Sequence, residues 1–92
     1  MDQLKFRATL AEEGFDEVEL RTMTPNLCNG AHSHQFDVRA LMVEGELTLG
    51  SESQTQTYTA GEIFSMAAGR QHTEQFGPQG ATYLVGRRRA QA

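Results

Sequence analysis

The sequence predicts an all-β domain, a sandwich or a barrel, with one short helix at its N-terminus. Three observations lead to this fold class: apolar and polar residues alternate over several short segments, turns that contain glycine separate those segments, and little of the chain after residue 14 has a helical period. A chain of 92 residues has room for one compact core and not for two. We therefore expect a single domain over residues 1–92.

The first 14 residues predict the helix. Asp2 can cap a helix that covers residues 3–13, and Gly14 is placed to end it. An imperfect apolar stripe would hold this helix against the core. The stripe consists of Leu4, Phe6, Leu10 and Ala11.

From residue 15 onward the pattern has a period of two, which is typical of half-buried strands. In the first of these segments we expect Val18, Leu20 and Thr22 to face the core. Residues 77–80 have the composition of a loop. The β-structure would span residues 17–86, with strands over residues 17–22, 31–43, 46–49, 54–59, 62–66, 71–76 and 81–86.

Charge and composition argue against several classes of protein. The formal net charge of −4 is unfavourable for nucleic acid, and no apolar run approaches the ~20 residues that span a bilayer. The N-terminus lacks the layout of a signal peptide, and the single Cys28 cannot form an internal disulfide, so we expect a cytoplasmic protein. The basic cluster over residues 87–89 would belong to a flexible tail, residues 87–92.

All three histidines of the sequence can be joined in one metal site. His32 and His34 lie two residues apart in a predicted strand, so both imidazoles would project from the same face and could bind one ion. Imidazole suits Zn, Ni, Fe and Cu, so the ligand type does not choose the metal. Taken alone, such a pair is more often two surface histidines on a strand edge.

The sequence around the histidines resembles the two signatures of the cupin superfamily. The first signature is matched by Gly-Ala-His-Ser-His at residues 30–34, by an acidic residue soon after and by Glu-Gly at residues 44–45. The second is matched by Gly61, Gly69 and His72, which fall on two glycine positions and the histidine position of that motif. The resemblance covers roughly residues 30–86 and is specific, because two motifs occur in the right order.

The resemblance implies a single cupin domain, which is a small antiparallel jelly-roll barrel (a double-stranded β-helix). It implies one divalent metal ion, Zn, Ni, Mn or Fe, bound by His32, His34 and His72 together with an acidic or other donor residue. It also implies a small-molecule ligand inside the barrel and a homodimer. Neither nucleic acid nor a membrane is expected as a partner.

The fourth ligand is where the sequence departs from the cupin pattern. The position that usually holds Glu, Gln or His is Val38, which cannot bind a metal. In a regular strand the histidines and Val38 would share one face, and Asp37 would lie on the other. Asp37 is a candidate ligand only if a bulge or turn near residues 35–36 shifts the register by one.

Two other roles are open for the carboxylates. Asp37 could instead be structural, paired with Arg39 or Arg21 or capping a turn, and the site would then hold three histidines and water. Glu74 lies two residues beyond His72 on the same strand face. It could be a general acid or base or could support a ligand, and a solvated glutamate at a sheet edge is the alternative.

Apolar side chains could line a pocket around the metal, although ordinary core packing would explain each of them as well. They are Phe36, Val38, Ala40, Met42, Phe64, Met66, Phe76 and Tyr83.

Two hypotheses of function follow. The first is a metal-dependent enzyme that acts on a small molecule as a dioxygenase, isomerase or lyase, with Asp37 and Glu74 as the candidate acids or bases. The second is a non-catalytic metal-binding or ligand-binding sensor module that acts through a partner protein. The fold does not choose between them, because one fold hosts many functions.

Overall fold

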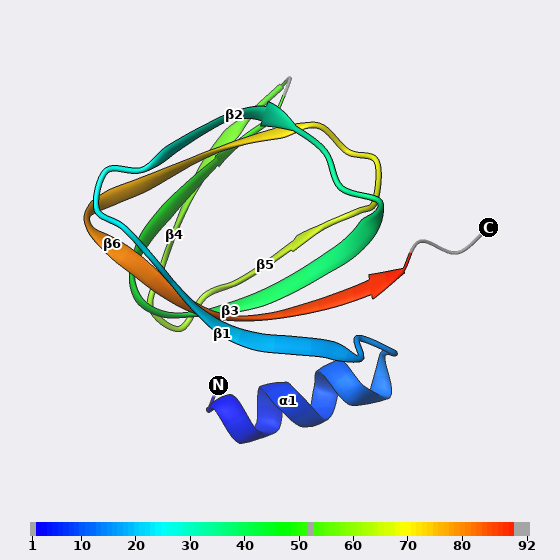
Figure 1. The fold of residues 1–92 in the computed structure, drawn as a ribbon. Coiled ribbons are helices and arrows are strands. Elements are labelled where there is room, and N and C mark those ends of the chain that lie inside the picture. Colours follow the sequence, from blue (N-terminus) through cyan, green and yellow to red (C-terminus); the bar gives the residue numbers. More distant parts are fainter. Residues whose placement is uncertain (1, 52, 90–92) are drawn as a thin grey trace.

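Two long antiparallel strands, β3 (Phe36–Gly50) and β6 (His72–Arg89), run through the whole fold (Figure 1). The computed structural model describes residues 2–51 and 53–89. The other elements are α1 (Gln3–Glu12), β1 (Glu17–Met23), β2 (Cys28–His32), β4 (Thr55–Thr59) and β5 (Ile63–Met66). The sheet order is β1-β6-β3-β4, while β2 pairs with β6 and β5 pairs with β3.

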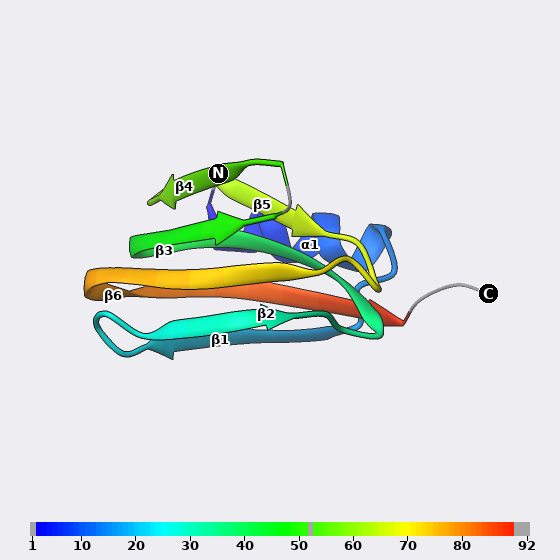
Figure 2. The same cartoon turned by 90° about the horizontal axis from the view of Figure 1, so that it is seen from above.

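Each long strand contributes to two sheets. The first half of β3 pairs with β5 and its second half with β4, while the first half of β6 pairs with β2 and its second half with β1. Figure 2 shows β4 and β5 on one side of the β3–β6 pair and β1 and β2 on the other. The result is an antiparallel barrel with one short N-terminal helix, which confirms the predicted fold class.

β3 and β6 pass from one sheet to the other at a corner near Gly45 and Gly80. The register of the pair shifts on both sides of Gly45, and both glycines have positive φ, +76° and +72°. A Cβ on Gly45 would collide with the carbonyl oxygen of Gly80 and lie 2.8 Å from the Cα of Ala81. The loop predicted over residues 77–80 is wrong, because β6 continues through it and pairs with β3 on both sides.

We expect Gly45→Ala to destabilise the fold far more than Gly61→Ala. Both glycines have positive φ, which costs an alanine about 1–2 kcal/mol, but a Cβ on Gly61 would have no neighbour within 4 Å. At Gly45 the two strands must also separate, so the loss of unfolding free energy should be at least about 2 kcal/mol larger. Urea denaturation of both variants measures the difference, and equal losses would contradict the close approach.

Buried side chains form two clusters on opposite sides of the first half of β3. Val38, Ala40 and Met42 face the interior of the barrel, while Leu41 between them faces outward, as the period of two requires. The interior cluster consists of Val38, Ala40, Met42, Leu47, Phe64, Phe76, Ala81, Tyr83 and Val85. The outer cluster consists of Phe6, Leu10, Phe15, Leu41 and Leu84.

α1 lies on the outside of the barrel (Figure 1), where Phe6 and Leu10 belong to the same buried cluster as Leu41 of β3 and Leu84 of β6. As predicted, the side chain of Asp2 caps the helix by accepting from the N–H of Lys5 at 2.8 Å, and Gly14 follows its end with φ +83°. The predicted stripe is only half right, because Phe6 and Leu10 are buried while Leu4 and Ala11 are exposed. In the described ranges, 2–51 and 53–89, no helix has the length and apolar character needed to cross a membrane.

The prediction for the faces of β1 is wrong in part. Val18 packs on the outer cluster, but Leu20 on the same face is 51% exposed and Thr22 is exposed too. The opposite face of β1 looks toward the barrel, where Met23 packs on the interior cluster and Arg21 lines a cavity. Side chains do alternate with a period of two along β1. Both faces of the strand have neighbours, however, so the polarity of the side chains does not tell which face is inside the barrel.

The predicted tail is wrong at residues 87–89, which belong to β6; residues 90–92 lie outside the described residues. Arg88 explains why the strand continues. Its Nη2 lies 2.8 Å from Oδ2 of Asp37, its Nη1 donates to the carbonyl oxygen of Glu13, and its guanidinium lies 4.5 Å from the ring centroid of Phe15. Arg88 thus ties the end of the helix to β3 and β6.

We expect Asp37→Asn to lower the melting temperature at neutral pH. A hydrogen bond from the N–H of Ala68, and then one from Arg88, lower the pKa of Asp37. The stabilisation is therefore present above the unfolded-state pKa of about 3.9 and is lost as the pH falls through the lower folded-state pKa. The melting temperatures of wild type and variant should converge as the pH falls below the folded-state pKa of Asp37. Asp16→Asn, at an exposed site, is the control, and a gap for Asp37→Asn that is constant with pH would contradict the ion pair.

Candidate metal centre

The three histidines come together at one end of the barrel interior. His32 ends β2, His72 begins β6, and the two are partners in the β2–β6 ladder. The ring centroid of His34 lies 4.9 Å from that of His32 and 5.3 Å from that of His72. One nitrogen from each ring lies within 4.8 Å of the others, so the cluster is suited to hold a metal ion.

His34 does not lie in the strand where it was predicted. β2 stops at His32, and residues 33–35 connect it to β3. The strand ends because β2 and β3 are not neighbours in the sheet, so the chain must cross between them. The carbonyl oxygen of His34 accepts instead from the N–H of Gly69 at 2.8 Å, which fixes this connection to the turn before His72.

Backbone carbonyls orient two of the rings. Nδ1 of His32 lies 2.7 Å from the carbonyl oxygen of Gly30, and Nδ1 of His72 lies 3.3 Å from that of Arg70. A carbonyl oxygen can only accept, so in both rings Nδ1 carries a proton, and Nε2 is the nitrogen left to face a metal ion. Hydrogen bonds of this kind fix the tautomer in most histidine metal sites.

His72 provides the test of whether a metal fits. Its Nε2 is buried and has no hydrogen-bond partner among the described residues. A buried polar atom without a partner is costly and calls for an explanation. A metal ion between the three rings would satisfy this atom, so the donor set fits a divalent cation.

His34 is kept neutral by its surroundings. Its ring stacks on Phe36, with centroids 4.8 Å apart and an interplanar angle of 14°. Burial lowers the pKa of His34, and the neighbouring His32 and His72 lower it further. A neutral imidazole is the form that binds a metal.

Asp37 is not part of the histidine group, which corrects its prediction as a possible ligand. A turn does occur near residues 35–36, but Asp37 still faces away from the interior on β3. Its Oδ1 accepts from the N–H of Ala68 and its Oδ2 from Arg88, both at 2.8 Å. Of the predicted alternatives, a structural carboxylate that caps a turn is the one that the geometry matches, with Arg88 as its partner.

Glu74 lies beside the cluster. Its Oε1 is 3.6 Å from Nε2 of His32 and accepts from Nδ2 of Asn29 at 3.0 Å. The side chain is only 13% exposed, so the alternative of a solvated edge residue does not hold. Among the described residues, Glu74 is the carboxylate that accompanies the histidines.

A small cavity of about 110 Å³ adjoins His34 and Glu74. Five of the predicted pocket residues line it: Phe36, Val38, Phe64, Met66 and Tyr83. Ala40, Met42 and Phe76 are buried in the interior cluster, which is the packing role that was the alternative. Burial raises the pKa of Tyr83, so its hydroxyl stays protonated at neutral pH.

Two arginines in this cavity were missed by the sequence reasoning. Arg21 and Arg87 line it, and both are ion-paired with Glu19, at 3.7 Å and 3.0 Å. The guanidinium of Arg87 also lies 5.6 Å from the ring centroid of Phe36. Arg21 was assigned to the outer face of its strand and Arg87 to a tail, so the sequence held no signal for either.

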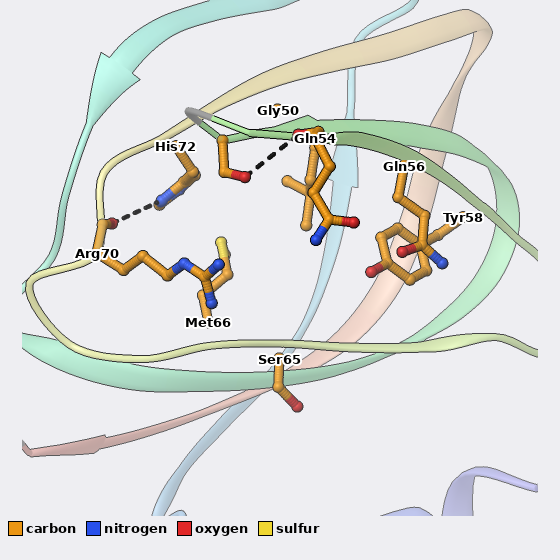
Figure 3. Close-up of a pocket in the computed structure, with 10 residues that line it drawn as sticks. Gly50, Gln54, Gln56, Tyr58, Ser65, Met66, Arg70 and His72 are labelled. Atoms are coloured by element: carbon orange, nitrogen blue, oxygen red, sulfur yellow. Dashed lines mark hydrogen bonds between the residues drawn. The ribbon is translucent and has the colours of Figure 1, made fainter.

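A second cavity, of about 210 Å³, opens beside His72 (Figure 3). Figure 3 shows the side chain of Arg70 extending from the turn before His72 toward Met66. The sequence reasoning missed this group too, although Gln54, Gln56 and Tyr58 alternate along one face of a predicted strand. The lining residues are Leu49, Gly50, Ser51, Gln54, Gln56, Tyr58, Ser65, Met66, Arg70 and His72.

Metal binding should weaken as the pH falls, because protons compete for the same nitrogens. The pKa of His34 lies below its ordinary 6.5, so its ring is neutral at pH 7. We expect the apparent zinc affinity to be nearly constant above about pH 7 and to fall steeply below about pH 6. Competition with a chromophoric chelator, corrected for the chelator's own protonation, measures it. An affinity that is unchanged from pH 7.5 to pH 5 would argue against imidazole ligands.

No family model and no curated protein matches the sequence. Solved structures do match the fold. A protein of unknown function from Rhizobium leguminosarum superposes with a TM-score of 0.73 at 21% identity, over 78% of this chain and 68% of that chain. A cupin-2 domain protein from Shewanella frigidimarina superposes with a TM-score of 0.66 at 20% identity, over 78% of this chain and 69% of that chain.

An RmlC-like cupin from the same Shewanella strain gives a TM-score of 0.68 at 19% identity, over 80% of this chain and 66% of that chain. These similarities confirm the fold predicted from the two motifs. The chain is a small cupin-fold protein with a cluster of three histidines suited to a metal ion.

Proposed function

We propose that this cupin-fold protein binds one divalent metal ion, Zn, Ni, Mn or Fe, through His32, His34 and His72, and acts on a small molecule as a metal-dependent enzyme. The observation that carries the proposal is the buried Nε2 of His72, which has no partner among the described residues and belongs to a group of three nitrogens within 4.8 Å of one another. Three histidines with an open position are a donor set used in catalytic metal sites.

The residues around the cluster have distinct tasks in this proposal. The carbonyl oxygens of Gly30 and Arg70 hold the rings of His32 and His72 with Nε2 toward the ion. When bound, the metal supplies a Lewis acid that polarises an oxygen of the substrate. Arg70 and the polar side chains of β4 give the substrate a charged and hydrogen-bonding wall next to His72.

An enzyme is favoured over a sensor module because space for a small molecule adjoins the histidines on two sides. His72 lines the cavity of about 210 Å³ and His34 the cavity of about 110 Å³. The cavity of about 110 Å³ is also lined by Glu74, so a carboxylate adjoins the histidines there. The homodimer and the cytoplasmic location expected from the sequence stay predictions.

We expect the purified full chain, made without a histidine tag, to hold one divalent ion per molecule. The double variant His32→Ala/His72→Ala should hold less than about a tenth of that amount, because two of the three nitrogen donors are gone. Elemental analysis after dialysis measures both. Wild type should also gain melting temperature when Zn or Ni is added, since an ion that binds the folded state stabilises it.

Ser33→Ala and Gln71→Ala are matched controls, since each changes a neighbour of a histidine and leaves all three rings in place. Both should bind metal as wild type does. Metal content that is below stoichiometry in wild type and unchanged in the double variant would remove the metal claim and leave the fold untouched.

A further inference from the structure

We propose that Glu74 is the carboxylate ligand of this metal centre and takes the place of the acid that cupins carry in their first motif, where this chain has Val38. The inference rests on the proposed function, because it needs a metal ion between the three histidines. It assigns Glu74 to the ion itself and not to the substrate.

The strand register puts Glu74 on the side of the ion. It lies two residues beyond His72 on β6, so both side chains leave the same face of the strand. Its partner across the ladder is Asn29 on β2, the strand that ends in His32. The acid therefore comes from β6, whereas Val38 on β3 packs in the interior cluster.

The distance to His32 fits two ligands of one ion. Nε2 of His32 and Oε1 of Glu74 are 3.6 Å apart. Metal–nitrogen and metal–oxygen bonds of about 2.0–2.2 Å at angles of 90–120° separate two donors by about 2.8–3.8 Å. The distance of 3.6 Å between His32 and Glu74 lies within this range.

The orientation of the His32 ring directs one nitrogen toward Glu74. Its Nδ1 is hydrogen-bonded to the carbonyl oxygen of Gly30, so Nε2 is the nitrogen that faces Oε1 of Glu74. A metal ion between the two groups would bind both of them and would also satisfy Nε2 of His72.

Asn29 holds the carboxylate in place. Its Nδ2 donates to Oε1 of Glu74 at 3.0 Å, and the glutamate side chain is mostly buried. The two arginines of the adjoining cavity do not compete for it, since Arg21 and Arg87 are ion-paired with Glu19.

The test compares Glu74→Gln with wild type and with the control Glu44→Gln, which makes the same change at an exposed glutamate of β3. Zinc affinity is measured by competition with a chelator, and the d–d absorption of the Co(II)-loaded protein reports the ligands. Loss of an outer-sphere partner typically costs 10–100-fold in affinity, so loss of a direct ligand should cost about 100-fold or more. The Co(II) spectrum should change in Glu74→Gln and stay as in wild type for Glu44→Gln.

The outcomes separate this inference from the proposed function. If Glu74→Gln keeps the Co(II) spectrum of wild type, with or without a loss of affinity, the carboxylate is not a ligand and the inference is overturned, while the three-histidine site stands. If wild type itself binds no divalent ion, the proposed function fails and the inference fails with it.

A second variant covers the case in which Glu74→Gln does not fold, as judged by circular dichroism. Glu74→Asp keeps the charge and shortens the side chain by one methylene group. We expect it to weaken zinc binding by at least about 10-fold and to alter the Co(II) spectrum, because the shorter carboxylate sits differently at the ion. An unaltered spectrum and affinity would overturn the inference here as well.

Discussion

The close approach of β3 and β6 at Gly45 and Gly80 is the constraint on which the rest of the structure depends. No side chain fits between the two strands at this corner, and both backbones have positive φ there. The bend lets one pair of strands serve two sheets, so β2 can pair with the first half of β6 while β1 pairs with the second. Because β2 and β6 meet in this way, His32 lies beside His72.

Some local signals in the sequence were reliable, such as the helix cap, although the loop predicted over residues 77–80 was not. Predictions that depend on distant partners failed. Asp2 caps α1 because the partner of its carboxylate is only three residues away. Arg88 looked like a tail residue because its partners, Asp37 and the carbonyl oxygen of Glu13, lie 51 and 75 residues away. Leu20 was placed on the wrong side because the other face of β1 also has neighbours, the interior cluster and its cavity.

In the candidate site, too, the part that depends on local sequence signals was predicted better than the part that depends on distant partners. Spacing and motif order identified the three histidines, although His34 reaches the group from a connecting segment and not from a strand. Glu74 was named as a candidate from its place two residues beyond His72, but its position beside His32 depends on a register shift between Asn29 and His32 on β2, which no local sequence pattern indicates. Asp37 was the candidate for the fourth ligand, because its neighbours along β3 gave no sign that Arg88 pairs with it.

If Glu74 on β6 takes the place of the acid that is missing at Val38, it also determines which side of the histidine cluster is left for a small molecule. With Glu74 and the Arg–Glu pairs on the side of His34, that cavity of about 110 Å³ already holds charged groups of the protein. The larger cavity, about 210 Å³, has Arg70 and the two glutamines of its wall near His72, and the lining residues that the structure describes include no carboxylate. A small anion is matched in charge there, whereas beside Glu74 it would meet a like charge. If Glu74 binds the ion as proposed, the described lining of the cavity on the His72 side is the better match in charge for an anionic substrate.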